Sequence, residues 1–421
     1  MSKTRKVHPA WIAAAITWLT LVASAGYRSA PSVLIVPLED AFGWSRSQIS
    51  LAISINILLY GLTAPFAAAL MERFTVRKVV MIALAFVSIS SAATIFMTQP
   101  WHFWFLWGVC VGLGTGSMAL VFAATIANRW FIARKGIVVG ALTAAGATGQ
   151  LIFLPLLSHI AVTYGWQKVS LTVAGACLLV VPLIFFFLKE SPEAIGMTPF
   201  GAPDNWQALP KSEMSAGRIT IDTAKRAFKD RNFLILFFTF FVCGLSTNGL
   251  IGTHFIPAAH DHKMDETVAA SLLALVGVFD VIGTIFSGYL TDKYDPRKLL
   301  FFYYGLRGLS LFLLPSILFQ TVHPSTFIFV VFYGLDWVAT VPPTLMLSRI
   351  VLGPQRATVV YGWVFVGHQV GASVAAFGAA LLRVKLGDYA IAFYISAAMC
   401  LFAAVLVLQI AKGIKTSELR V

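Results

Sequence analysis

"GYLTDKYDPRK" at residues 288–298 is a short, densely charged segment in a chain that is otherwise mostly apolar, and "ALMERFTVRK" at residues 69–78 repeats its pattern. Both segments place an acid, a base, an aromatic residue, two further residues and a basic pair in the same order, so that Glu72 corresponds to Asp292. A pattern that occurs twice indicates an internal duplication.

The composition around these segments predicts a membrane protein. The chain has 421 residues, of which 58% are hydrophobic and 12% charged, and its mean hydropathy is +0.82. A soluble domain carries about 25% charged residues, and crossing a bilayer takes about 20 apolar ones. We therefore expect a polytopic, all-α membrane protein. The predicted spans are 10–37, 48–70, 79–97, 101–124, 137–160, 166–188, 232–257, 266–290, 299–320, 324–347, 357–382 and 387–411.

The net charge of +13 follows the membrane topology and does not indicate nucleic-acid binding. With the N-terminus in the cytoplasm, 24 of the 31 Lys and Arg residues fall in cytoplasmic segments and five on the opposite side. The remaining two, Arg28 and Arg307, lie inside spans. Basic residues concentrate in cytoplasmic loops of membrane proteins. We therefore expect both termini in the cytoplasm.

The offset that places Glu72 on Asp292 relates more than the two charged segments. With the same offset Pro37 falls on Pro257, and Arg129 on Arg349. The stretch 189–231 is polar and separates the copies. The sequence thus predicts a bundle of six spans over 1–188, a cytoplasmic linker over 189–231, and a second bundle of six spans over 232–421. Parallel repeats of this kind are a known plan for transporters.

The charged segments connect spans 2 and 3 and spans 8 and 9. An acid at a helix end interacts favourably with the N-terminus of a neighbouring helix, and basic residues hold a loop at the membrane interface. We interpret the two segments as a conformational latch between bundles; the alternative is a solvated, positive-inside loop. The latch residues are Glu72, Arg73, Arg77, Asp292, Lys293 and Arg297.

The second charged segment resembles the signature loop of the major facilitator superfamily. The matching positions are Gly288, Leu290, Asp292, Lys293, Arg297 and Lys298. "FGWSRSQIS", "GLGTGSMALVFAATIANRWF" and "ARKGIVVGALTAAGATGQLIFLPLL" are similar to the branch that contains monocarboxylate transporters and oxalate–formate exchangers. Within that branch, the stretch "FDVIGTIFSGYLTDKYDPRKLLFFYYGLRGLSL" is similar to bacterial members, most of them uncharacterised. The resemblance implies secondary transport by two pseudo-symmetric six-helix bundles, in a bacterial inner membrane.

One departure from this branch concerns span 8. Carriers of the branch have an Asp there, followed four residues later by an Arg that binds the carboxylate. Asp280 matches the Asp, but Thr284 stands at the Arg position. The anion-binding charge must therefore come from elsewhere, or the substrate is different.

Charges inside spans cost about 2.5–3.5 kcal/mol each and indicate functional sites. In the superfamily, spans 1, 4, 7 and 10 line the cavity. Arg28, beside Tyr27 on span 1, is the candidate for holding a carboxylate, which a guanidinium binds with two parallel hydrogen bonds. The alternative is a structural pair with an acid across the bundle.

Two intramembrane acids are candidates for proton coupling. Asp280 is the first, with a permanent pair to Arg307 as its alternative; Asp336 on span 10 is the second, with a pair to Arg28 as its alternative. We expect Arg307, on a supporting span, to be structural. Neutral polar residues of lining or flanking spans would complete the pocket, or else form interhelical hydrogen bonds. They are Asn56, Tyr60, Gln150, Asn248, His368 and Gln369.

These observations predict a secondary transporter that moves a small organic anion, a carboxylate, by alternating access with proton coupling. The alternative is an exporter or antiporter of a larger amphipathic metabolite or drug. The sequence shows no nucleotide-binding loop, metal cluster or nucleophile constellation, so we expect neither an enzyme nor a cofactor. The expected partners are the anion, the proton and the lipid bilayer, and we expect a monomer.

Overall fold

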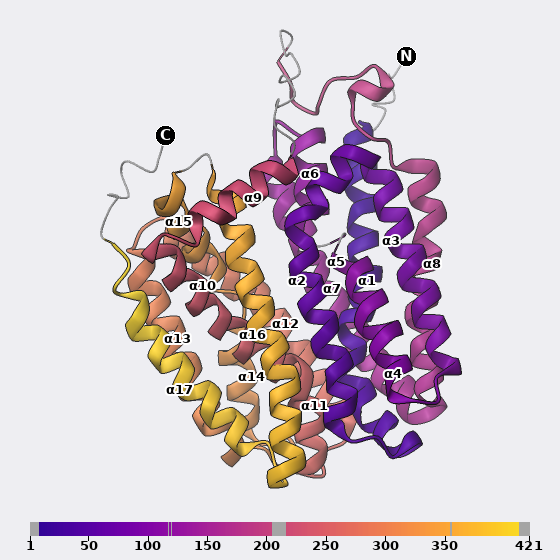
Figure 1. The fold of residues 1–421 in the computed structure, drawn as a ribbon, viewed down its shortest axis with the longest axis vertical. Coiled ribbons are helices and arrows are strands. Elements are labelled where there is room, and N and C mark those ends of the chain that lie inside the picture. Colours follow the sequence, from indigo (N-terminus) through magenta and orange to yellow (C-terminus); the bar gives the residue numbers. More distant parts are fainter. Residues whose placement is uncertain (1–7, 117, 119, 204–215, 354–355, 412–421) are drawn as a thin grey trace.

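The computed structural model describes residues 8–203, 216–353 and 356–411, apart from residues 117 and 119. Over these residues the chain forms helices and no strand (Figure 1). Within the described residues, eleven helices are long and apolar enough to cross a membrane. The predicted span 101–124 falls instead on several shorter helical segments. The all-α polytopic fold is confirmed.

The first half of the chain forms one bundle, coloured indigo to magenta in Figure 1. Its long helices are α1 (Pro9–Phe42), α2 (Arg46–Phe74), α3 (Val76–Ala93), α7 (Lys135–Tyr164) and α8 (Trp166–Phe187). The shorter segments between α3 and α7 are α4 (Pro100–Phe103), the π-helical η2 (Trp104–Val111), α5 (Gly112–Gly116) and α6 (Leu120–Trp130). A 3₁₀ turn, η1 (Thr94–Phe96), extends α3, and another, η3 (Glu193–Ile195), follows α8.

The second half forms the other bundle, coloured crimson to yellow in Figure 1. The linker helix α9 (Ala216–Ala227) precedes it. Its spans are α10 (Arg231–Gly244) with η4 (Leu245–Ile251) and α11 (Gly252–Asp261); α12 (Glu266–Thr291); α13 (Pro296–Leu313) with η5 (Leu314–Ser316); α14 (Pro324–Asp336) with α15 (Val341–Leu352); α16 (Ala357–Leu386); and α17 (Ala390–Val407). The division of the chain at 188/189 and 231/232 stays a prediction.

The duplication is visible in the helix starts. Ser45 caps the N-terminus of α2, accepting a hydrogen bond from a backbone N–H, and Asp265, at the equivalent position of the second copy, caps α12 in the same way. Thr75 caps α3, and its equivalent Asp295 caps α13. Short polar side chains at this position satisfy N–H groups that the helix leaves unpaired. The repeat therefore preserves the capping function where the residue itself has changed.

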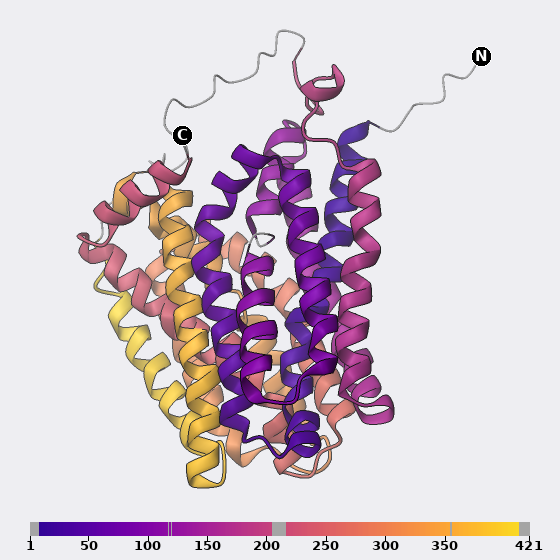
Figure 2. The ribbon, with the colours of Figure 1, turned by 45° about the vertical axis from the view of Figure 1, so that its right-hand side comes forward.

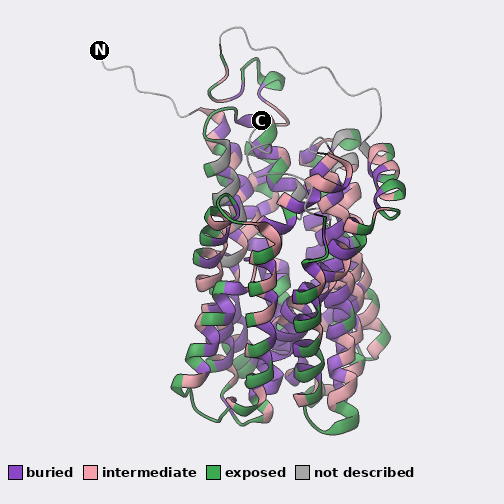
Figure 3. Ribbon diagram, turned by 90° about the vertical axis from the view of Figure 1, so that its left-hand side faces the viewer, coloured by how far each residue is buried: buried purple, intermediate pink, exposed green. Residues whose placement is uncertain are grey.

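The bundles meet along α2 and α16, which lie side by side in Figures 1 and 2. There the Ser54 hydroxyl donates to the carbonyl oxygen of Ser373 at 2.9 Å, and both side chains are buried. Large apolar side chains such as Ile82, Phe96 and Ile285 are exposed on the perimeter, where the exposed residues of the spans also appear in Figure 3. An apolar perimeter is what a lipid environment requires.

Candidate functional site

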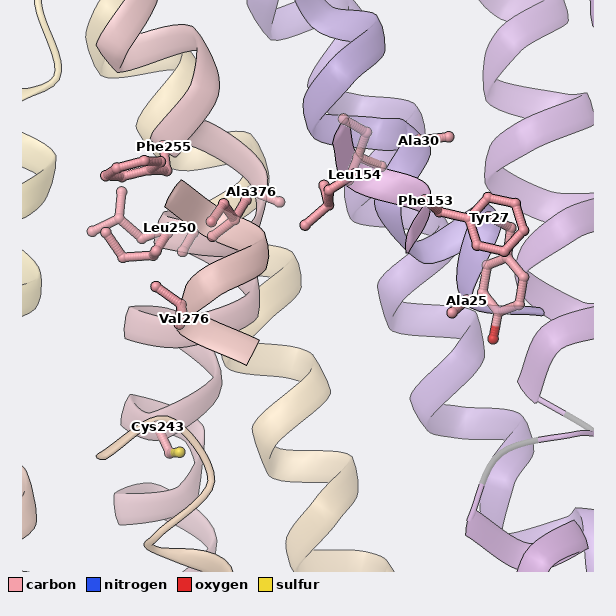
Figure 4. Close-up of a cluster of buried hydrophobic side chains, with 14 of the residues drawn as sticks. Ala25, Tyr27, Ala30, Phe153, Leu154, Cys243, Leu250, Phe255, Val276 and Ala376 are labelled. Carbon is pink, nitrogen blue, oxygen red and sulfur yellow. The ribbon is translucent and has the colours of Figure 1, made fainter. Parts of the chain in front are cut away.

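A cavity lies between the two bundles, near the middle of the spans. Its wall is formed by α1, α2 and α7 from the first half and by η4, α11, α12, α16 and the turn after α14 from the second. Part of the wall is apolar: Leu154 of α7 and Val276 of α12 lie on facing bundles (Figure 4), together with Ile53 and Leu273. Sites at such a repeat interface are typical of transporters.

The seventh span changes helix type where it meets the cavity. The α-helix α10 gives way to the π-helical segment η4, and α11 resumes at Gly252. Within it, the Thr253 hydroxyl donates to the carbonyl oxygen of Asn248, five residues earlier, at 2.9 Å. Asn248, Gly252 and Thr253 all line the cavity. Short π-helical stretches inside α-helices are frequent at functional sites.

The tenth span is broken at the cavity, between α14 and α15. A break leaves backbone groups without helical partners. Two charged side chains, Arg307 and Asp280, supply partners for these groups. Arg307 donates to the carbonyl oxygens of Asp336 and Trp337, at 2.5 and 3.2 Å, and the Asp280 carboxylate accepts the N–H of Val338 at 3.0 Å. Trp337, in the break, forms part of the cavity wall.

Arg28 carries the charge of the cavity wall. Its side chain is exposed, whereas Tyr27 and Ser29 beside it are buried. The guanidinium carbon lies 5.9 Å from the centre of the Tyr60 ring. No described residue forms an ion pair at contact distance or a hydrogen bond with this guanidinium, although Asp280 on the other bundle interacts with it electrostatically. The structural pair predicted as the alternative for Arg28 is therefore not formed at contact distance.

Of the eight residues predicted to bind substrate, seven line the cavity: Tyr27, Arg28, Asn56, Tyr60, Gln150, Asn248 and Gln369. Asn56 also has a structural bond, since its amide donates to the carbonyl oxygen of Trp107 at 2.8 Å. His368 is not part of the wall. It is buried between the rings of Phe240 and Phe365, at 4.9 and 5.6 Å between centroids.

The charged residues inside the spans form a different pair from the two that the sequence suggested. Arg307 pairs with Asp336 at 2.6 Å, and its side chain is completely buried. The pairings of Asp280 with Arg307 and of Asp336 with Arg28 are not formed. Asp280 is half-buried and accepts the hydroxyl of Thr284 at 3.0 Å, besides the N–H of Val338. Asp280 is thus held by neutral donors.

The predicted latch residues make their resolved contacts within their own bundles. Arg77 lies 5.8 Å from the ring of Phe185, and Arg73 lies over its neighbour Phe74. In the second copy, Lys293 contacts Tyr289, and Arg297 binds Asp295 and the carbonyl oxygen of Ile410. Asp292 follows the end of α12, and the side chain of Glu72 lies outside the described part of the structure. A latch between bundles stays a prediction.

Sequence reasoning missed a charge cluster at the end of the bundles opposite the linker. Arg46 of α2 is buried and binds Glu39 at 2.8 Å and Asp261 of α11 at 2.9 Å, and Asp261 also binds Arg383 at 2.6 Å. The Arg46–Asp261 pair joins the two bundles. The duplication could have indicated this cluster. It aligns Arg46 with Glu266, an acid of the second copy that contacts His260.

A second missed residue is Glu190, which follows α8. Its carboxylate accepts hydrogen bonds from Arg129 at the end of α6 and from the N–H of Val76 at the start of α3. A carboxylate is favourable at a helix N-terminus because of the positive end of the helix dipole. Glu190 thus ties three spans together at the linker face, and its place directly after an apolar run was the available signal.

Comparison with known proteins identifies the family. The chain is 26% identical to the uncharacterized MFS-type transporter YcxA of Bacillus subtilis over 79% of this chain and 78% of that protein. It is 25% identical to monocarboxylate transporter 13 of Rattus norvegicus over 88% and 81%.

The fold matches solved structures at low sequence identity. A D-xylose–proton symporter superposes with a TM-score of 0.73 at 14% identity, covering 96% of this chain and 99% of that one. A bacterial homologue of the lysosomal transporter Spinster gives 0.69 at 15%, covering 95% and 97%. Residues 16–376 and 255–416 match the family model described as Major Facilitator Superfamily. The chain is a multi-pass membrane transporter that belongs to the major facilitator superfamily.

Proposed function

We propose that this transporter moves a small organic carboxylate across the bacterial inner membrane by alternating access, with the linker face in the cytoplasm and a proton as coupling ion. Arg28 is the counter-charge for the carboxylate, and Asp280 carries the proton. The similarity to monocarboxylate transporters supports a carboxylate. The substitution of Thr284 for the expected Arg is compensated by a cation on the opposite bundle.

The observation that carries the proposal is the state of Arg28. A cation inside a membrane protein is expensive unless it is paired or serves a function. Arg307 is paired with Asp336, whereas Arg28 is exposed in the cavity without a resolved partner among the described residues. A carboxylate entering the cavity would supply two charge-assisted hydrogen bonds to the guanidinium.

The test compares Arg28→Gln and Arg28→Lys with the wild type in proteoliposomes. The substrate is the carboxylate that most raises the melting temperature of the purified protein in a panel of mono- and dicarboxylates. Losing a hydrogen bond to a charged group costs about 1.5–3 kcal/mol, so Arg28→Gln should weaken uptake by roughly ten- to a hundredfold.

In the same assay Arg28→Lys should retain part of the uptake, because it keeps the charge but loses the two-pronged geometry. Arg134→Gln removes an exposed arginine outside the cavity and serves as the control. Wild-type uptake by Arg28→Gln would reject the proposal.

Proton coupling is tested separately with Asp280→Asn. The amide keeps an oxygen that accepts from Thr284 and Val338 but does not titrate. Uptake driven by a pH gradient should be lost, while exchange of labelled for unlabelled substrate, which needs no net proton movement, should continue. Gradient-driven accumulation at the wild-type level would show that another group carries the proton.

A further inference from the structure

Three carboxamides from three different helical segments point into the cavity that holds Arg28. Gln150 comes from α7, Asn248 from η4 and Gln369 from α16, so both bundles contribute. Each amide offers two N–H donors and a carbonyl acceptor. A wall with this many neutral polar side chains is more than a carboxylate alone requires, since Arg28 already supplies its counter-charge.

These three amides differ in their bonding from Ser29 and Asn56, which also line the cavity. Ser29 donates to the carbonyl oxygen of Ala25, and Asn56 to that of Trp107, so both are bound within the protein. No hydrogen bond of the Gln150, Asn248 or Gln369 side chains is resolved within the described residues. Gln369 is only 3% exposed. Its amide atoms are not fully buried, so they are open to the cavity, and the cavity's contents supply their hydrogen-bond partners.

The packing around Gln369 and Trp337 holds both residues at the wall. A Cβ atom added to Gly61 of α2 would lie 2.4 Å from the Cβ of Gln369, so the glycine leaves the space that the glutamine stem occupies. A Cβ added to Gly252 would lie 3.7 Å from the indole of Trp337, so the indole lies close to the seventh span. The amide and the indole are thus presented by close helix contacts.

The chemistry of this wall selects a hydroxylated ligand. A hydroxyl group both donates and accepts, as a carboxamide does, so neighbouring hydroxyls match the amides. The indole of Trp337 provides a flat apolar surface for the C–H groups between them. Arg28 is the single charged residue among those that line the cavity. Resting on the function proposed above, we propose that the substrate is a polyhydroxylated monocarboxylate of the sugar-acid class, read by Gln150, Asn248 and Gln369.

The test measures binding of three probes to the purified full-length protein by isothermal titration calorimetry. Gluconate has one carboxylate and five hydroxyls on a six-carbon chain, hexanoate has the carboxylate alone, and sorbitol has the hydroxyls alone. A site built to bind hydroxyls strongly rejects analogues that lack them. We expect gluconate to bind at least about tenfold more tightly than hexanoate, and sorbitol to bind more weakly than gluconate.

The outcomes distinguish this inference from the proposed function. Equal or tighter binding of hexanoate overturns the hydroxyl inference and leaves the carboxylate proposal intact. If sorbitol binds as tightly as gluconate or more tightly, Arg28 does not contribute to binding through its charge, and the three amides alone bind the hydroxyl groups. No detectable binding of gluconate overturns the inference.

Variants of the amides give an independent readout. Asn248→Leu and Gln150→Leu remove the hydrogen-bonding groups with little change in size. Each should reduce the affinity for gluconate by roughly tenfold while leaving that for hexanoate unchanged or higher. An unchanged ratio of gluconate to hexanoate affinity in both variants would overturn the inference. If neither variant folds, the three-probe comparison on the wild type decides.

Discussion

Thr75 connects α2 to α3 with a φ of 77° and a ψ of 145°, a backbone conformation that side chains with a Cβ atom rarely adopt. The residue compensates in part, because its hydroxyl accepts the N–H of Lys78 at 3.4 Å and caps α3. Asp295 at the equivalent position of the second copy has a φ of −60° and caps α13 without this strain. The first charged segment is therefore the strained copy.

Thr75→Gly should stabilise the protein by about 1 kcal/mol, because a conformation that costs about 1–3 kcal/mol is relieved while a glycine cap loses only a few tenths. Thr75→Ala is the matched variant: it keeps the strain and loses the cap, so it should destabilise by about 1 kcal/mol. Thermal unfolding in one detergent compares the three proteins. A glycine variant no more stable than the wild type would show that Thr75 is not strained.

Single residues differed in how well the sequence predicted their place. Arg28 and its polar neighbours could be predicted to face the cavity, because lipid excludes a charge and the resemblance orients span 1. The partner of Arg307 could not be predicted from the sequence. It depends on the rotation of α13 about its axis and on the carbonyl oxygens that the break in the tenth span leaves without helical partners. His368 looked like a pocket residue, yet the rings packed around it keep it away from the wall.

The linker helix α9 contacts α2 of the first bundle and α16 of the second. Asp222 of α9 binds Arg356 at 2.6 Å, and the indole of Trp363 on α16 donates to the carbonyl oxygen of Thr220 at 3.0 Å. Trp363 also lies edge-on against Phe66 of α2, with the ring centres 6.2 Å apart. The linker is thus fastened to the start of α16, next to α2.

The hydrogen bond from Arg356 lowers the pKa of Asp222 below its ordinary value, and Arg226 adds to the effect. Because the folded pKa lies below the unfolded one, the pair stabilises the docked helix at pH values above about 3.9 and is lost as the pH falls through the folded pKa. Docking of α9 should therefore not change between pH 5 and pH 8.

Asp222→Asn should reproduce at pH 7 what acid does to the wild type. Hydrogen exchange of the backbone amides in α9 should accelerate a few-fold, since an exposed ion pair contributes modestly. Glu193→Gln, which neutralises another exposed acid of the linker, should leave the exchange of α9 unchanged. Equal exchange in Asp222→Asn and the wild type would show that the pair does not fasten the helix.

Elements were predictable where apolar length decides them. The long helices coincide with predicted spans because about 20 apolar residues in lipid must be helical. The breaks were not predictable: the run that contains η4 and the run that contains the turn after Asp336 are as apolar as unbroken spans. A break depends on side chains from other helices that satisfy the freed backbone groups, as Arg307 and Asp280 do.

At the scale of the molecule, the Arg46–Asp261 pair joins the bundles at the face opposite the linker. Alternating access requires this contact to break when the cavity opens to that face. Arg46 is the central residue, because it binds an acid on each bundle, whereas Arg383 binds Asp261 within one bundle. The pair therefore stabilises the conformation described here relative to its alternative.

Arg46→Ala should shift the population toward the conformation open at that face. Spin labels at Lys168→Cys and Lys263→Cys, one on each bundle, report the separation, because both positions are exposed and the four native cysteines are buried. A coupling of about 1–3 kcal/mol shifts a two-state equilibrium roughly 5- to 150-fold, so a longer distance should become populated.

The control is Glu266→Gln, which changes the contact with His260 inside one bundle and should leave the distances unchanged. If the distances in Arg46→Ala are the same as in the wild type, the Arg46–Asp261 pair does not control the conformational equilibrium.

The two-bundle plan could be predicted from the sequence because the repeat is regular: α3 (76–93) and α13 (296–313) begin and end at equivalent positions of the two copies. The contact between the bundles could not be predicted from the sequence. Arg46 is predicted from the sequence to be an exposed loop charge, and it is buried only because Asp261 of α11, on the other bundle, lies against it.

The central claim is that Arg28 binds the carboxylate of the substrate. It is tested most directly by a structure of the protein with the carboxylate that binds most tightly in the panel. The account predicts both carboxylate oxygens within about 2.7–2.9 Å of the Arg28 guanidinium nitrogens. A carboxylate bound elsewhere, with that guanidinium still unoccupied, would contradict it.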